Sequence, residues 1–307
     1  MAREIEALIA GLNKPQKSIA PKYFYDETGS GLFEKITTLP EYYLTSTELG
    51  IMDSHIDEIA AAVGPQASLI EFGSGSSVKT RMLLQHLDKL AAYVPVDISE
   101  EHLLESQRNI RAAFPHIEVL PVVADFTRRF SLPAPATMPL RNVVYFPGST
   151  IGNFEYDDAV ELLRVMHNEA GDGGALLIGV DLQKNPSVIH DAYNDSADVT
   201  ARFNRNMLRH LNREFGSDFN LESFRHRATY DSDEGRVVIE LVSTRQQAVH
   251  LGGATILLDE GEAILTEYSH KYTLESFAAM AEVAGFTVSK VWTDPNQWFS
   301  VQLLLRD

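Results

Sequence analysis

Three consecutive apolar segments of this chain each end in residues that could bind a nucleoside. The first, IEF, leads into GSGSSVKT, where Gly73 and Gly75 allow a tight turn and a close approach of the backbone to a ligand. Asp97 ends the second segment, about 20 residues further on, where an acid typically binds ribose hydroxyls. Asp125 and Phe126 end the third, offering an acceptor for an exocyclic amine and a ring that stacks on a purine. Each residue alone could be a turn, a helix cap or a core residue, but their coincidence predicts a nucleoside site.

The glycine loop also limits which nucleoside is expected. A dinucleotide fingerprint has a third glycine where this chain has Val78, and no Walker-type G-K-[ST] sequence occurs. S-adenosylmethionine lacks the pyrophosphate that the third glycine serves, and its positive sulfonium suits an acidic protein. S-adenosylmethionine is therefore one candidate ligand, and a nicotinamide-dependent dehydrogenase is the alternative class of protein.

A second candidate site lies in ILTEYSHKY, residues 264–272, which has the character of a β-strand. Because strand side chains alternate between faces, Glu267, Ser269 and Lys271 are expected to share one face. In the simplest interpretation that face is solvated. In the other interpretation it belongs to a pocket that binds a polar ring.

The elements that would position these residues follow two patterns. Apolar strands alternate with helices up to Leu182, which predicts a doubly wound, parallel α/β sheet. The expected strands are 68–72, 92–98, 118–126, 142–149 and 174–182, and the expected helices are 46–63, 78–92, 99–114 and 155–170. After Leu182 come a helix over 199–215 and strand-like pieces at 225–231, 236–251 and 263–272. This inserted α+β section, joined by residues 1–46, is expected to cap the carboxyl edge of the sheet, where ligands bind.

Composition excludes several classes of function. The chain has 307 residues, 44% of them hydrophobic, and a formal net charge of −17, which disfavours nucleic acid and anionic membranes as partners. The absence of cysteine excludes disulfides, thiolate nucleophiles and Cys-zinc sites, and the ten histidines form no metal-binding motif. No apolar run approaches the ~20 residues of a membrane span, and the amino-terminal segment lacks the features of a signal peptide. We expect a soluble, cytoplasmic, monomeric protein that holds no metal.

Seven segments together resemble the histidine Nα-methyltransferases of ergothioneine biosynthesis. They are PKYFYDETGSGLFEKITTLPEYYLT, IEFGSGSSVKT, VPVDIS, VADF, FPGSTIGNFE, AYNDSADVTARFNRNML and LTEYSHKY, in order and over nearly the whole chain. The resemblance implies a class I, Rossmann-like methyltransferase domain (47–190 plus 273–307) and an α+β substrate-binding domain (1–46 plus 191–272). It also implies trimethylation of the α-amino group of L-histidine to hercynine, with S-adenosylmethionine as methyl donor.

The resemblance further implies the residues of two sites. The cofactor site would consist of Gly73, Lys79, Asp97, Asp125 and Phe126. The substrate site would consist of Tyr25, Tyr42, Asn153, Tyr193, Glu267 and Ser269. Within them, Lys79 would reach the cofactor carboxylate, and Glu267 with Ser269 would bind the imidazole. Tyr42, Asn153 and Tyr193 would hold the amino-acid backbone, with Asn153 and Tyr42 also acting as the catalytic residues.

Three alternatives stay open from the sequence. Tyr25 and Tyr42 could be core aromatics, and Asn153 could be a turn residue or a helix N-cap. The substrate could be another aromatic amino acid such as tryptophan. The protein could also bind S-adenosylmethionine without catalysis.

Overall fold

The computed structural model describes residues 2–74 and 78–306, and the chain divides into two compact units. The first unit combines Met1–Tyr43 with Lys184–His270, and the second combines Leu44–Gln183 with Lys271–Asp307. The chain therefore passes from one unit to the other after Tyr43, Gln183 and His270. It stays a prediction that the second unit binds the cofactor and the first unit binds the substrate.

The second unit is built on a seven-stranded sheet in the order β12-β13-β6-β5-β2-β3-β4. Its parallel strands are β2 (Ala67–Phe72), β3 (Ala92–Asp97), β4 (Val122–Val123), β5 (Arg141–Phe146) and β6 (Ala175–Asp181). Its antiparallel strands are β12 (Phe286–Thr293) and β13 (Phe299–Arg306). All six residues of β2 and all seven of β6 are buried, as expected for strands covered on both faces.

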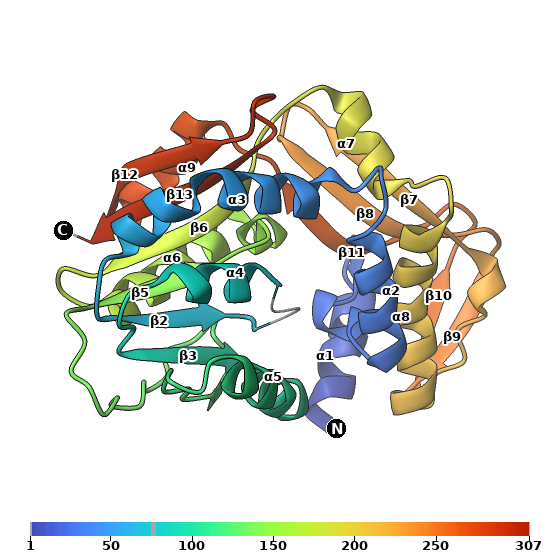
Figure 1. Cartoon of the computed structure of the whole chain (residues 1–307). Helices are drawn as coiled ribbons and strands as arrows, with labels where there is room; N and C mark the ends of the chain where they lie inside the picture. The colour runs from blue at the N-terminus through green and yellow to red at the C-terminus, as the bar shows by residue number, and fades with distance from the viewer. Residues whose placement is uncertain (1, 75–77, 307) are drawn as a thin grey trace. The chain divides into compact units, whose positions relative to one another are not determined.

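Helices cover both faces of this sheet (Figure 1). One face carries α3 (Tyr43–Val63), α4 (Val78–His86) and α5 (Glu100–Ala113), whose apolar side chains join one core cluster. The other carries α6 (Tyr156–Ala170) and α9 (Leu274–Val283), which join a second cluster. A short 3₁₀ helix, η2 (Thr150–Asn153), follows β5. The predicted α/β fold class is confirmed.

Three predicted elements differ from the structure. The expected strand 118–126 is reduced to β4, because Pro121 cannot donate to a ladder and Val119 makes only an isolated bridge to Tyr93. The expected helix 78–92 ends at His86. The expected strand 236–251 is two strands, β8 and β9, separated by a turn after Ser243.

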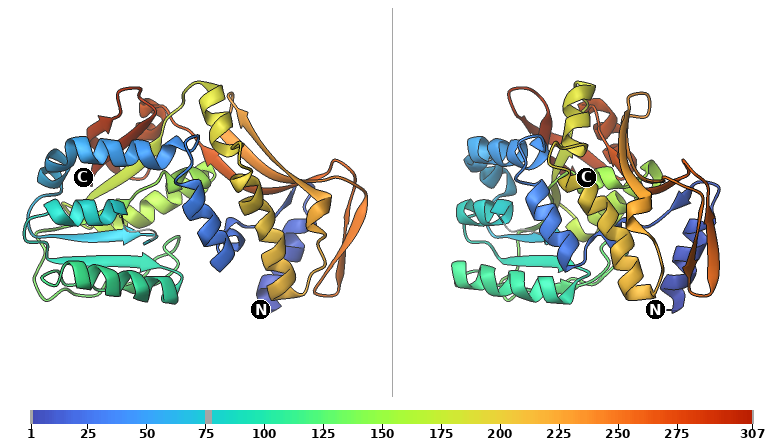
Figure 2. Two further views of the ribbon diagram at one scale, coloured as in Figure 1. Left: turned by 45° about the vertical axis from the view of Figure 1, so that its right-hand side comes forward. Right: turned by 90° about the vertical axis from the view of Figure 1, so that its right-hand side faces the viewer.

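The first unit contains a smaller sheet in the order β1-β11-β8-β7, together with a β9-β10 hairpin. Its strands are β1 (Lys17–Ser18), β7 (Phe224–Asp231), β8 (Arg236–Ser243), β9 (Gln247–Leu251), β10 (Ala254–Leu258) and β11 (Ala263–His270). Its helices are α1 (Ala2–Leu12), η1 (Pro21–Phe24), α2 (Glu27–Ile36), α7 (Pro186–Tyr193), α8 (Val199–Phe215) and η3 (Leu221–Ser223). Apolar residues of α1, α2 and α8 share one core with this sheet, and α8 lies against β7 and β8 (Figure 2).

Strand β11 carries the face that the sequence singled out. Its pairing with β8 shifts register between Leu265 and Glu267 and is then continuous to His270, so Glu267 and Ser269 lie on the same face. That Lys271 shares this face stays a prediction. The strand ends at His270, and Lys271 belongs to the second unit, where its ammonium lies 2.7 Å from the carboxylate of Asp181.

No helix in residues 2–74 and 78–306 combines the length and apolarity that crossing a membrane requires.

Candidate active site

Two predicted substrate residues of the first unit meet directly. The hydroxyls of Tyr193, at the end of α7, and Ser269, on β11, lie 2.7 Å apart although the residues are separated by 76 positions. Both side chains are buried. The ring of Tyr42 lies edge-on to that of Tyr193, with centroids 6.3 Å apart. Residues from three distant segments thus form one small polar and aromatic cluster.

Tyr25 links this cluster to Glu267. Its ring makes edge contacts with Phe24, Phe33 and Phe203, so the interpretation of Tyr25 as a core aromatic is correct for one side of the ring. The residue is nevertheless 45% exposed. Desolvation of its hydroxyl, together with the negative charge of Glu267 and the nearby phenol group of Tyr42, raises the pKa of Tyr25 well above its ordinary value. Tyr25 is therefore a neutral hydrogen-bond donor throughout the physiological range.

The first unit therefore gathers five of the six predicted substrate residues. They are Tyr25, Tyr42, Tyr193, Glu267 and Ser269. The arrangement offers several hydroxyls and one carboxylate, which is the donor and acceptor set that an amino acid with a polar ring requires. Their role as substrate ligands stays a prediction.

Asn153, the sixth, belongs to the second unit and ends η2, just beyond β5. The interpretation of Asn153 as the N-cap of α6 is wrong, because Glu155 holds that position. The preceding Ser149 adopts a left-handed backbone conformation, with φ of 55°. Its hydroxyl accepts a hydrogen bond of 2.9 Å from the backbone N–H of Asp181. This bond ties the β5–η2 turn to the end of β6.

The glycine loop begins as predicted at the end of β2. Gly73 has a φ of +76°, which disfavours any residue with a side chain, and its N–H donates to the carbonyl of Val96 at 2.9 Å. A Cβ at Gly73 would lie 3.6 Å from the ring of Phe126. The predicted cofactor residues Gly73 and Phe126 are thus neighbours. Gly75 lies outside the described residues.

Asp97 and Asp125 lie at the same edge of the sheet. Asp97 pairs with Val123 in the β3–β4 ladder, and the N–H of Ala124 donates to its carbonyl at 3.0 Å. Each carboxylate accepts from the backbone N–H two residues on, Ser99 at 2.9 Å and Thr127 at 3.1 Å. These turns fix the two carboxylates and leave further lone pairs for hydroxyls or an amine. The residues present therefore fit the ribose and adenine of S-adenosylmethionine.

Lys79 has a partner that the sequence did not reveal. Its ammonium lies 2.5 Å from a carboxylate oxygen of Glu48, on α3, whose side chain is 1% exposed. Glu48 also accepts from the N–H of Gly148 at 2.9 Å. A Cβ at Gly179 would lie 2.2 Å from its Oε1, so this glycine makes room for the carboxylate. Lys79 and Gly148 lie 31 and 100 positions from Glu48 in the sequence, and no sequence pattern connects either residue to Glu48.

Glu71 is the second acid that the sequence interpretation missed, although its signal was present as a lone acid in an apolar strand. It is buried at the carboxyl end of β2 and accepts from the hydroxyl of Thr80 at 2.7 Å and from that of Tyr93. Burial raises the pKa of Glu71 to about 7, although both hydrogen bonds act in the opposite direction. Within the described ranges, no three His, Cys, Asp or Glu side chains are grouped as a metal site would require.

Comparison with known proteins identifies the family. A family profile described as "Histidine-specific methyltransferase, SAM-dependent" matches residues 4–306. The chain belongs to this family. It is similar to the histidine N-alpha-methyltransferase of Mycolicibacterium smegmatis, with 40% identity over 97% of this chain and 93% of that protein. It is also similar to the histidine N-alpha-methyltransferase of Mycobacterium tuberculosis, with 37% identity over 96% and 92%.

The fold has counterparts among solved structures. The mitomycin 7-O-methyltransferase MmcR matches with a TM-score of 0.50 at 13% identity, over 100% of this chain and 68% of that one. At this identity the likeness concerns the fold alone. Family membership confirms the predicted enzyme class, a methyltransferase, and the predicted cofactor, S-adenosylmethionine.

Proposed function

We propose that this protein transfers methyl groups from S-adenosylmethionine to the α-amino nitrogen of L-histidine. The product would be the trimethylated betaine hercynine, in the first step of ergothioneine biosynthesis. The observation that carries the proposal is the contact between Tyr193 and Ser269, with Glu267 on the same face of β11. This contact joins Tyr193, which is proposed to bind the amino-acid backbone, to Ser269 and Glu267, which are proposed to bind the ring.

Glu267 would select the ring. An ionised carboxylate only accepts hydrogen bonds, so it requires an N–H or O–H donor from the substrate. Imidazole has one N–H in either neutral tautomer and two as the cation, whereas a phenyl ring has none. A binding site whose own polar groups are left unpaired rejects the wrong ligand strongly. The proposed site therefore favours histidine over phenylalanine.

The cofactor residues would act by position and charge. Asp97 would accept from the ribose hydroxyls, Asp125 from the adenine amine, and Phe126 would lie against the base. Lys79 would donate to the cofactor carboxylate, because its ammonium has three N–H donors and Glu48 engages one face of it. When bound, S-adenosylmethionine supplies a methyl group that its sulfonium already activates.

Asn153 and Tyr42 would act at the amine. The amine must be neutral to attack, and the amide oxygen of Asn153 can accept from one N–H and so direct the lone pair. We propose that the proton leaves through water or along the tyrosines, with Tyr42 as the candidate. The enzyme would thus contribute orientation more than acid–base strength.

The variant Asn153→Ala tests this role. We expect kcat to fall about 100-fold, because an effect on orientation appears in the chemical step. The dissociation constant of S-adenosylmethionine, measured by calorimetry, should change less than about twofold. An unchanged kcat would remove Asn153 from the mechanism.

Incubation with S-adenosylmethionine and a panel of amino acids tests the function itself. We expect mono-, di- and trimethylated histidine in the mass spectrum, and far less product from tryptophan, tyrosine and phenylalanine. A preference for tryptophan would replace the proposed substrate, and binding of S-adenosylmethionine without any product would indicate a non-catalytic protein.

We also propose that the protein acts as a monomer in the cytoplasm, without nucleic acid or membrane as partners. The absence of cysteine agrees with a reducing compartment, and the net charge of −17 disfavours nucleic acid and anionic membranes. Light scattering during size-exclusion chromatography and cell fractionation would test it.

A further inference from the structure

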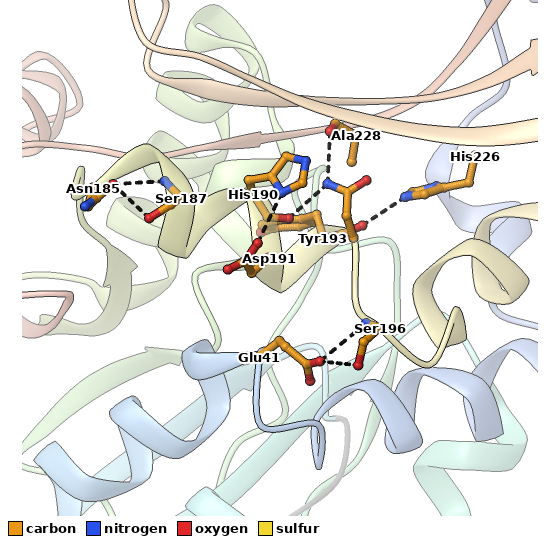
Figure 3. Close-up of polar contacts among 10 residues, drawn as sticks. Glu41, Asn185, Ser187, His190, Asp191, Tyr193, Ser196, His226 and Ala228 are labelled. Atoms are coloured by element: carbon orange, nitrogen blue, oxygen red, sulfur yellow. Dashed lines mark hydrogen bonds and ion pairs between the residues drawn. The ribbon is translucent and has the colours of Figure 1, made fainter.

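The segment from the last residue of α7 to the start of α8, residues 193–198, is bonded to several elements of the first unit (Figure 3). The amide of Asn194 donates to the carbonyl of Ala228 on β7 at 3.1 Å. Ser196 donates through its hydroxyl to Glu41, the neighbour of Tyr42, at 2.8 Å. Asp195 accepts from the first N–H groups of α8. This segment therefore fixes Tyr193 relative to the rest of the cluster.

His226 contacts the backbone of Tyr193 itself. It lies on β7, on the same face as the buried residues Phe224 and Ala228, and its Nε2 lies 2.9 Å from the carbonyl oxygen of Tyr193 (Figure 3). Because a carbonyl only accepts, Nε2 must carry a proton. The other ring nitrogen, Nδ1, lies 2.9 Å from Nδ2 of Asn204.

Asn204 determines the tautomer of this histidine. Its Nδ2 also lies 3.0 Å from the carbonyl oxygen of Glu240, which can only accept, so Nδ2 is the donor in both contacts. Nδ1 of His226 is then an acceptor and carries no proton. Both ends of the ring thus require the same neutral tautomer, with its N–H aimed at Tyr193.

The charges around His226 agree with a neutral ring. Desolvation lowers the pKa of His226 below its ordinary value, while the Tyr193 carbonyl and Asp195 oppose this shift. Arg205 acts in the same direction as desolvation, and Asp198 acts against it. A second proton would also place an N–H of the ring against the N–H of Asn204.

We propose that His226 is a positioning residue for the substrate site, which holds the backbone of Tyr193 so that its hydroxyl meets Ser269. The inference rests on the proposed function, because it assigns His226 to the site in which Tyr193 binds the amino acid. His226 touches neither ring nor amine of the substrate in this scheme. It acts only through the carbonyl of Tyr193.

Two substitutions separate the contacts of His226. In His226→Gln, the terminal amide nitrogen superposes on Nε2 and can still donate to Tyr193. In His226→Asn, the shorter amide reaches the position of Nδ1 and can still accept from Asn204, but it cannot reach Tyr193. We expect the KM for histidine to rise about tenfold in His226→Asn and to stay within about threefold of wild type in His226→Gln.

The readouts distinguish positioning from a loss of folded protein. The dissociation constant of S-adenosylmethionine should be unchanged in both variants, because its predicted site lies in the second unit. A merely structural role would lower the active fraction, and hence apparent kcat, and leave KM alone. His190→Ala, an exposed histidine on α7, is the matched control and should leave KM unchanged.

Equal KM values for His226→Asn and His226→Gln would overturn the inference. Tyr193→Phe separates this failure from that of the proposed function. If Tyr193→Phe raises the KM for histidine but His226→Asn does not, the proposed site holds and the role of His226 is wrong. If the wild type methylates no histidine, the proposed function itself fails.

Discussion

The two units place their polar groups in different ways. The second unit buries charge: Glu71 in β2, Glu48 against Lys79, and Asp181 against Lys271, a pair in which both side chains are fully buried. The cluster around Tyr193 and Ser269 in the first unit instead gathers mainly neutral hydroxyls, although this unit also buries the carboxylates of Asp26 and Asp195. Removing a buried charge leaves its partner uncompensated, whereas a hydroxyl pair has a small net energy. Substitutions of the buried charges of the second unit should therefore affect stability, and substitutions in the hydroxyl cluster of the first unit should affect substrate selection.

The largest expected effect is that of Lys271→Met. It leaves the carboxylate of Asp181 buried without its cation, so the free energy of unfolding in urea should fall by about 3–5 kcal/mol. The double variant Lys271→Met/Asp181→Asn should recover much of this loss. Arg164→Met, which breaks an ion pair on the exposed face of α6, is the control and should hardly change stability. Equal effects of Lys271→Met and Arg164→Met would contradict the comparison.

Glu71 should give the second unit a pH-dependent stability. Its pKa is about 7 in the folded protein, against an ordinary value near 4.5. Between these values the folded state holds a proton that the unfolded state lacks, so stability is present at low pH and is lost as pH rises through about 7. Relative to Glu71→Gln, the wild type should lose about 3 kcal/mol between pH 4.5 and 8. Parallel pH profiles of the two proteins would show that Glu71 does not titrate in this window.

In the first unit, Glu267→Ala should alter selection with little effect on stability. We expect kcat/KM for histidine to fall about 30-fold relative to phenylalanine, because only histidine loses a hydrogen bond to a charged acceptor. Competition between the two amino acids, read by mass, measures the ratio, and Glu234→Ala in the β7–β8 turn is the control. A preserved ratio would remove Glu267 from ring recognition.

The smallest effect concerns the hydroxyl pair. A double-mutant cycle with Tyr193→Phe and Ser269→Ala should give a coupling energy of about 1 kcal/mol in unfolding, typical of a neutral hydrogen bond. The same cycle measured on the KM for histidine should show coupling of similar size if both groups hold one substrate. Additive effects in both measurements would mean that the two hydroxyls act independently.

The strand-end residues were predictable because their placement depends on the alternation of strands and helices. Gly73, Asp97 and Asp125 needed only the rule that parallel strands bring their carboxyl ends to one edge. Helix α7 was missed, although Asn185 followed by Pro186 is a signal for the start of a helix. In the structure the side chain of Asn185 is the N-cap of α7 and accepts a hydrogen bond from the N–H of Ser187. A helix of eight residues has too weak a periodicity to stand out.

The partners of buried groups could not be predicted in the same way. Glu48 meets Gly148, 100 positions away, and His226 meets Tyr193, 33 positions earlier. Such contacts arise from tertiary packing, which no local pattern encodes. The register shift between Leu265 and Glu267 likewise depends on how β11 pairs with β8. The alternation of residues in this segment predicted that Glu267 and Ser269 share a face. Only the pairing of β11 with β8 shows that the strand ends at His270.

The position of β13 has a consequence for synthesis of the protein. This strand lies inside the seven-stranded sheet, between β12 and β6, although it spans Phe299–Arg306. During translation β6 is made more than a hundred residues earlier than its partner, so a mainly apolar edge stays unpaired until β13 has been made. An open edge of this kind invites pairing with other chains. Truncated or stalled products that lack β13 should therefore aggregate, and chaperones that shield β6 should raise the yield of native enzyme.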